Sequence, residues 1–224
     1  MTGLSVVAWQ AAKKRAESDL DGGLATLLGA LVGGRIAYVA VNWDYFQHQP
    51  QDIIQVWLGG LSGVGALAGA VVAIGLVAHI RQIPWGSVAD TLLPLGGSMA
   101  ITAWLACWIE GSAYGEPSTA WWALPAPDEW GALAPRQPVQ LMGALLVLGL
   151  YWLLEQLHHR LPFPGLAASI LGLGLSAELF GLSFLRADPI PVWLGLRLEA
   201  WGAVGMAAIM IIFLGFGYLN RATP

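Results

Sequence analysis

Long runs of apolar residues, separated by short polar breaks, make up most of this chain. Six of these runs approach the roughly 20 residues that an α-helix needs to cross the hydrocarbon core of a bilayer. They cover residues 24–42, 58–80, 88–109, 139–157, 166–184 and 200–219. Stretches such as 141–154 show no alternation of polar and apolar positions, which excludes the strands of a closed membrane barrel. The pattern predicts an all-α integral membrane protein, a polytopic bundle of about six transmembrane helices plus interfacial segments.

The composition agrees with lipid as the solvent. Hydrophobic residues make up 57% of the chain and charged residues 11%, whereas soluble domains carry about 25% charged residues. The 29 glycines favour a compact bundle, because small residues let membrane helices approach closely. The formal net charge of -4 and the dispersed basic residues argue against nucleic acid as a partner. We expect residues 1–224 to form a single transmembrane domain.

Three segments outside the spans have patterns of their own. Residues 1–12 are apolar but too short to cross a bilayer and run into Lys13-Lys14-Arg15, so residues 1–23 are expected to be a cytoplasmic segment or half-helix. Residues 44–57 interleave polar and apolar side chains, as does a short helix that lies in the membrane interface. Residues 110–138 form the longest loop and are rich in Trp and Tyr. An aromatic belt at the interface and contact with a substrate are both open for this loop.

The basic residues predict the orientation. Cytoplasmic loops of membrane proteins carry an excess of Lys and Arg. One side of the predicted bundle has six such residues and the other has Arg136, Arg186 and Arg197; the six are Lys13, Lys14, Arg15, Arg81, Arg160 and Arg221. The larger group should face the cytoplasm, so the C-terminus is expected to be cytoplasmic and the 110–138 loop extracytoplasmic.

Two ionisable residues fall near the middle of predicted spans. Arg35 is about eleven residues into one span and Glu178 about twelve residues into another, so the two groups should lie at similar depth. A charge at this depth costs several kcal/mol unless it is paired or hydrated. The sequence leaves two interpretations open. One is a buried ion pair that fixes the helices, and the other is a polar cavity that holds a lipid headgroup.

The other polar residues give weaker signals. Asp90 lies near the start of its predicted helix, where a carboxylate favours the positive end of the helix dipole, so we expect a capping role. Ser62 has no nearby His and Asp pattern that would make it a nucleophile. Cys107 is the only cysteine, and the four histidines lack the spacing of a helical metal site. We expect neither a metal nor a cofactor.

Short motifs follow one another in a definite order. Residues 33–39 read G-G-R-I-A-Y-V, Trp57 precedes G-G-L-S and Gly65, and Asp90 and Pro94 come next. G-S-A-Y-G at 111–115 precedes Pro117, Trp122 and Ala123, and P-V-Q-L occupies 138–141. This series resembles the bacterial prolipoprotein diacylglyceryl transferases, with their G-G-R-x-G-Y-V, W-x-G-G-x-S-x-H-G-G, N-G-E-x-x-G and H-P-x-Q-L-Y-E motifs. The resemblance covers nearly all of the chain from residue 24 onward, and the family's first helix would be absent or shortened at Met1.

The resemblance implies an inner-membrane protein related to enzymes that move a diacylglyceryl group from phosphatidylglycerol to the lipobox cysteine of a preprolipoprotein. It also implies that charged residues of the family are replaced here. The Arg of G-R-x-G-x-F-x-N-G-E falls on Trp104, the His residues of H-G-G and H-P-x-Q-L on Val64 and Gln137, and a late membrane Arg and Glu on Leu179 and Ser183. Arg186 is retained. Neither Trp nor Leu can grip a phosphate as the forked guanidinium does.

We therefore expect a transferase-like, phospholipid-binding membrane protein that lacks the family's catalytic residues and acts as a lipid-binding or scaffolding subunit. The alternative is a divergent active transferase that uses Arg35, Glu110 and Glu178. A small transporter is a third class, but we find no inverted repeat. The expected partners are a phosphatidylglycerol-like lipid and other membrane subunits, and the catalytic residues are left unassigned. The residues expected to contact lipid are Arg35, Tyr38, Ser62, Gly65, Glu110, Gly111, Gly115, Gln140, Glu178 and Arg186.

Overall fold

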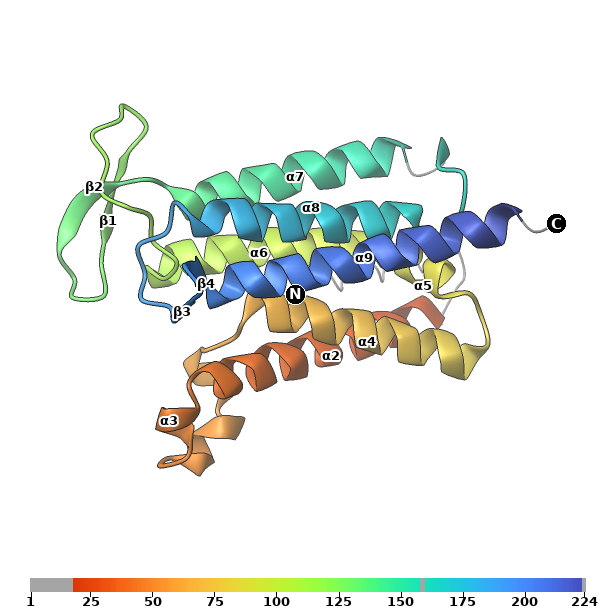
Figure 1. The fold of residues 1–224 in the computed structure, drawn as a ribbon, viewed down its shortest axis with the longest axis horizontal. Coiled ribbons are helices and arrows are strands. Elements are labelled where there is room, and N and C mark those ends of the chain that lie inside the picture. The colour runs from red at the N-terminus through yellow and green to blue at the C-terminus, as the bar shows by residue number, and fades with distance from the viewer. Residues whose placement is uncertain (1–17, 158–159, 223–224) are drawn as a thin grey trace.

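The computed structural model describes residues 18–157 and 160–222, and its elements follow one another along a helical bundle (Figure 1). The α-helices are α2 (Ser18–Val41), α3 (Trp43–Phe46), α4 (Gly63–Arg81), α5 (Trp85–Thr91), α6 (Leu93–Glu110), α7 (Val139–Leu157), α8 (Leu166–Ser183) and α9 (Leu198–Ala222). Two 3₁₀ helices, η1 (Pro50–Ile54) and η2 (Val56–Leu58), follow α3. The strands are β1 (Leu124–Pro127), β2 (Leu133–Arg136), β3 (Val192–Trp193) and β4 (Leu196–Arg197). The predicted N-terminal half-helix and the Lys13-Lys14-Arg15 cluster lie outside the described residues.

The predicted fold class is confirmed. In the described part of the chain, 5 helices are long and apolar enough to cross a membrane, or up to 6 if a bent helix pair is counted as one span. The bent pair is α5 and α6, which meet at Leu92 at an angle of 54°. The prediction of one continuous helix over 88–109 is therefore wrong. Pro94 lies in the first turn of α6, where its missing N–H is tolerated, whereas in a continuous helix it would remove a hydrogen bond and clash with the preceding turn.

The second span also begins later than predicted, at Gly63 and not at residue 58. Gly59 and Gly60 have positive φ angles of 88° and 78°, which glycine adopts without strain. Ser62 then caps α4, because its hydroxyl accepts a hydrogen bond from the backbone N–H of Gly65 at 3.3 Å.

Helices α2 and α4 form a tightly packed pair beside a second group made of α6, α7, α8 and α9 (Figure 1). Glycines at the α2–α4 contact leave no room for side chains: a Cβ atom added to Gly69 would overlap the carbonyl oxygen of Gly29, and one added to Gly65 would overlap Gly33. Such small-residue contacts let membrane helices pack backbone to backbone. Helix α4 also contacts α9, which joins the pair to the second group.

The two ends of the bundle differ. One end, here called the hairpin end, carries α3 and both β-hairpins, and the other, the α5 end, carries α5 and the start of α8 (Figure 1). The predicted loop at 110–138 contains an antiparallel hairpin in which Leu124 pairs with Arg136. This hairpin was not predicted, and prolines at 125 and 127 are typical of edge strands. The predicted interfacial helix over 44–57 is only partly correct, since the segment is one turn of α3 followed by η1 and η2.

At the α5 end, Asp90 connects two helices. Its carboxylate accepts hydrogen bonds from the backbone N–H groups of Gly165, at 2.6 Å, and Ala168, at 2.9 Å. Asp90 therefore caps α8 and not its own helix, because the break at Leu92 places it near the end of the short α5. The expected capping role is found, but on a different helix.

Candidate functional site

Arg35 is buried on α2 near the hairpin end, and its guanidinium is surrounded by backbone carbonyls. Nε donates to Ile53 O at 2.9 Å, Nη1 to Gly59 O at 2.7 Å and to Gly60 O at 2.9 Å, and Nη2 to Asp52 O. These acceptors belong to the chain between α3 and α4, whose glycine turns aim two carbonyls at the charge. Of the two interpretations left open for Arg35, the ion pair with Glu178 is not found among the described residues, because backbone carbonyls satisfy the buried cation instead.

Of the other predicted site residues, Tyr38 contacts Arg35, with its ring centre 5.7 Å from the guanidinium carbon. Ser62 and Gly65 form the start of α4, where Ser62 N donates to Gly34 O at 3.0 Å. A cavity of about 280 Å³ opens beside Arg35, lined by Arg35, Ile36, Val39, Ala40, Trp43 and Ile53. Apart from Arg35 the lining side chains are apolar, so this cavity fits hydrocarbon better than a polar headgroup.

A second group of predicted residues meets where α6 and α7 reach the hairpin end. The side-chain amide of Gln140 donates to Ser112 O at 2.8 Å, and Gly111 ends α6 with a φ of 72°. A cavity of about 210 Å³ lies here, lined by Trp108, Gly111, Tyr114, Pro125, Ala126, Pro127 and Gln140. Gly115 is buried nearby and pairs with Arg186 through an isolated β-bridge. Glu110 is exposed at the end of α6 and does not line the cavity.

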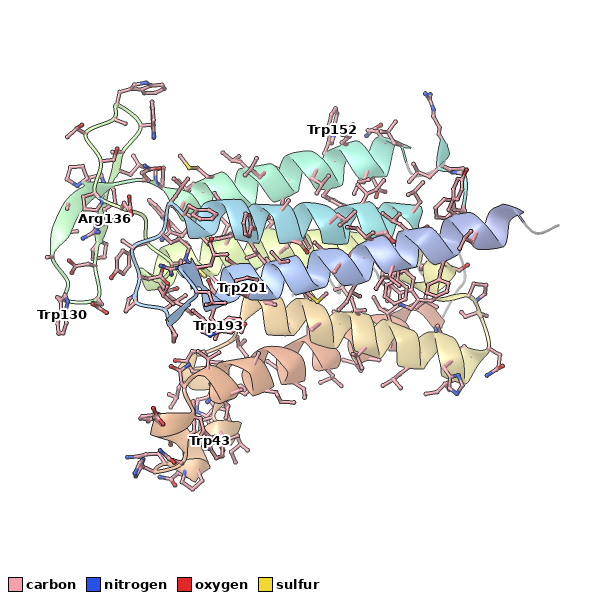
Figure 2. The ribbon with its side chains drawn as sticks, in the orientation of Figure 1. Trp43, Trp130, Arg136, Trp152, Trp193 and Trp201 are labelled. Carbon is pink, nitrogen blue, oxygen red and sulfur yellow. The ribbon has the colours of Figure 1, made fainter. Side chains whose placement is uncertain are left out.

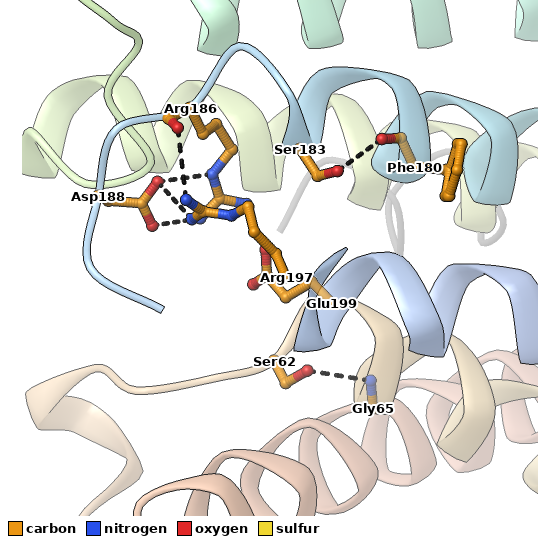
Figure 3. Close-up of polar contacts among 8 residues, drawn as sticks. All are labelled: Ser62, Gly65, Phe180, Ser183, Arg186, Asp188, Arg197 and Glu199. Carbon is orange, nitrogen blue, oxygen red and sulfur yellow. Dashed lines mark hydrogen bonds and ion pairs between the residues drawn. The ribbon is translucent and has the colours of Figure 1, made fainter. Parts of the chain in front are cut away.

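Arg186 belongs to a network of four charges beside these cavities (Figure 3). Its guanidinium contacts Asp188 at 2.6 Å and Glu199 at 2.7 Å, and Arg197 contacts Asp188 at 3.0 Å. Burial alone would lower the pKa of Arg186, but the hydrogen bond to Asp188 and the charges of Glu199 and Asp188 raise it above its usual value. Both positive charges are thus matched by carboxylates, and the network holds the hairpin end of α8 to that of α9.

Of the four residues in this network, only Arg186 was predicted from the sequence to be a site residue. Asp188 is close to it in sequence, but Arg197 and Glu199 reach it through the β3–β4 hairpin. The turn of this hairpin is Leu194-Gly195, with φ angles of 48° and 78°. Two consecutive residues with positive φ are typical of a tight hairpin turn. The Gly195 position was the one signal in the sequence that could have indicated this contact.

Glu178 lies deeper in the bundle, on α8. Its Oε1 atom is buried and has no hydrogen-bond partner within the described part of the chain. The structure therefore separates the ten predicted residues into two groups at the hairpin end and Glu178, which lies farther from that end along α8. Within the described residues, no group of three or more His, Cys, Asp or Glu side chains is placed to hold a metal ion.

Three of the residues that the resemblance places at charged or ionisable positions, Trp104, Leu179 and Val64, are packed against neighbouring elements. Trp104 and Leu179 belong to the same apolar cluster between α6, α7 and α8. The Trp104 ring lies against Gly143, where an added Cβ atom would overlap it. Val64 lies against Gly202 of α9, where an added Cβ would be 2.6 Å from the Val64 side chain.

Comparisons with known proteins agree with the motif order. The family model described as prolipoprotein diacylglyceryl transferase matches residues 1–216. A phosphatidylglycerol--prolipoprotein diacylglyceryl transferase from Synechococcus elongatus is 30% identical over 211 residues, which cover 88% of this chain and 72% of the relative. The proteins of that name from Nitratidesulfovibrio vulgaris and Chlamydia trachomatis are each 29% identical, over 84% and 92% of this chain and 70% and 79% of their own lengths. The chain therefore belongs to the prolipoprotein diacylglyceryl transferase family, a family of polytopic bacterial membrane proteins.

Proposed function

We propose that this chain binds phospholipid in the bacterial inner membrane but does not transfer diacylglyceryl, and that it acts as a lipid-binding or scaffolding subunit. The observation that carries the proposal is the packing of Trp104, Leu179 and Val64 at positions where the resemblance expects charged or ionisable side chains. Transfer from phosphatidylglycerol releases an anionic phosphoglycerol. Donors that are positioned to stabilise developing charge commonly supply the largest catalytic effect. Apolar side chains cannot supply it.

The two cavities at the hairpin end are where we place the lipid. The apolar cavity beside Arg35 would take hydrocarbon, and the guanidinium keeps one of its five N–H donors for a headgroup after the four carbonyl bonds. The cavity lined by Gly111 and Gln140 offers amide and backbone groups that suit a glycerol or phosphate oxygen. Lipid binding in either cavity would not require a catalytic group.

A divergent active transferase is the second candidate, and Glu178 favours it. A buried carboxyl oxygen without a partner is costly inside a membrane, and such residues are often functional. In this alternative Glu178 would exchange protons with the attacking thiol, and Arg35 and Glu110 would bind the headgroup.

The test supplies the purified chain with labelled phosphatidylglycerol and a lipobox peptide, with the Synechococcus elongatus relative as the positive control. We expect no thioether-linked product above the level without protein, because one lost donor of this kind costs about 10²–10³ in rate and several are missing. Phospholipid should still copurify and be detectable by mass spectrometry. Turnover that Glu178→Gln abolishes in a folded protein would establish the divergent transferase.

The orientation can be tested separately. We propose that the hairpin end is extracytoplasmic and the C-terminus cytoplasmic, because Arg81 and Arg160 lie at the other end of the bundle with the Lys13-Lys14-Arg15 cluster assigned to that side. In a Cys107→Ala background, a cysteine at Ser118 should react with an impermeant reagent added to whole spheroplasts, and a cysteine at Arg160 should react only after lysis. The reverse pattern would invert the topology.

A further inference from the structure

We propose that residues 43–58, here called the arm, lie in the headgroup region of the bilayer at the hairpin end, and that Arg35 holds them there. The arm comprises α3, η1 and η2 and extends sideways from the end of α2 (Figure 1). The proposal does not depend on whether the chain binds a specific phospholipid or has transferase activity.

The arm exposes large apolar side chains that water would not favour. The exposed fractions are 74% for Ile54, 73% for Trp57 and 71% for Leu58, and Trp43 and Tyr45 are each 53% exposed. Exposing side chains this large to water is unfavourable, whereas Trp and Tyr are enriched where lipid headgroups meet hydrocarbon.

Exposed polar side chains gather in the middle of the arm. Gln47, His48 and Gln49 are exposed in the turn between α3 and η1, and Gln51 is exposed within η1. The most exposed apolar residues lie on either side of this stretch, Trp43 and Tyr45 before it and Ile54, Trp57 and Leu58 after it. Tyr45 donates a hydrogen bond to the Asp52 carboxylate at 2.6 Å. This contact, with the charge of Asp52, raises the pKa of Tyr45. The arm thus has the amphipathic character of a segment that lies along a membrane surface.

The apolar side of the arm continues a surface that already faces lipid. Helix α2 is one of the helices that qualify as membrane spans, and Ile36 on it is 64% exposed. Ile36 lines the cavity of about 280 Å³ together with Trp43 and Ile53 of the arm. Figure 2 shows Trp43 at the same end of the bundle as Trp193 and Trp201, the end at which an aromatic interface belt is expected. Because the two surfaces share this cavity, lipid that covers α2 also reaches the arm.

Arg35 joins the arm to α2, where its guanidinium also lies over the buried ring of Phe46. Its guanidinium donates four hydrogen bonds, to the carbonyls of residues 52 and 53 within the arm and to those of residues 59 and 60 directly after it. Arg35 is itself only 8% exposed, so the bonds form away from water. Lysine could not reproduce them, since an ammonium is a point charge with three donors.

Spin labels can locate the arm. In a Cys107→Ala background, single cysteines at Ile54, Trp57 and, as a matched control, Gln49 are labelled and the protein is placed in phosphatidylcholine nanodiscs. We expect the ratio of collisions with oxygen to collisions with a water-soluble nickel chelate to be several-fold higher at positions 54 and 57 than at 49. In Arg35→Lys, the label at 54 should become more mobile, while a label at Leu145 on α7, away from the arm, should not change.

Equal chelate accessibility at 49, 54 and 57 would place the arm in water and overturn the proposal, leaving its apolar residues for a protein partner. Unchanged mobility at position 54 in Arg35→Lys would overturn the role given to Arg35. The Leu145 label reports whether each variant has kept the fold of the bundle, so a general loss of structure is recognised.

Discussion

Replacing Gly143 by alanine should destabilise the bundle by about 1–3 kcal/mol, the usual cost of overpacking a tight core. The reason is the contact across α6 and α7: a Cβ atom at position 143 would overlap the indole of Trp104. Trp104 is only 8% exposed and is enclosed by the apolar cluster that also contains Val139 and Val147, so it has little space to move. The unfolding free energy in mixed detergent micelles would be measured by steric trapping or by titration with a denaturant.

Gly149 offers a matched control on the same helix. An alanine Cβ there would meet nothing within 4 Å, so Gly149→Ala should be neutral or stabilise slightly. Trp104→Leu alone should be destabilising, because it leaves a cavity. The double variant Gly143→Ala/Trp104→Leu should lose less stability than the sum of the losses in the two single variants, because the smaller side chain at position 104 makes room for the new methyl group. Strict additivity would show that the two residues are not in contact.

The sequence predicted the parts of the fold that depend on local hydropathy. Helix α7 has the predicted bounds, because Pro138 precedes it and a polar break follows Leu157. The break between α5 and α6 was missed because Leu92 and Pro94 both fit an apolar window, although proline alters the backbone. The β1–β2 hairpin was missed because its turn depends on local hydrogen bonds: the Asp128 carboxylate accepts from Trp130 N at 3.0 Å and Ala132 N at 2.9 Å.

The candidate site was predicted less well than the spans, for a physical reason. Arg35 was correctly expected to need compensation inside the membrane, but pairing by charge considers side chains only. The groups that compensate it are carbonyl oxygens, which every residue carries. Gly59 and Gly60 present two of them to the guanidinium, and η1 presents the other two. The Arg186 network likewise depends on the β3–β4 pairing, which joins Arg197 to Asp188 across a turn. Contacts of this kind depend on tertiary structure that hydropathy and spacing do not contain.

Asp90→Ala should have the other large effect, a loss of about 3 kcal/mol in unfolding free energy, because each hydrogen bond to a charged group contributes about 1.5–3 kcal/mol. The carboxylate binds two N–H groups at the start of α8, and no other described side chain is hydrogen-bonded to them. The approach depends on Gly86 of α5, since a Cβ atom there would overlap the Pro164 carbonyl. Without the cap, the first turn of α8 would be left with unsatisfied donors near the membrane surface.

Asp90→Asn separates the charge from the shape. It keeps one acceptor oxygen in place but removes the negative charge that favours the helix N-terminus. The unfolding free energy of Asp90→Asn should therefore lie between that of the wild type and that of Asp90→Ala. Hydrogen exchange gives a local readout: the amides of Gly165 and Ala168 should lose protection in both variants, whereas those of α7, which lies outside the contact, should not. Glu129→Gln removes a negative charge at an exposed turn of the β1–β2 hairpin and should change neither stability nor exchange. If Asp90→Ala unfolded no more readily than Glu129→Gln, or if the two amides kept their protection, the carboxylate would not be what holds α5 to α8.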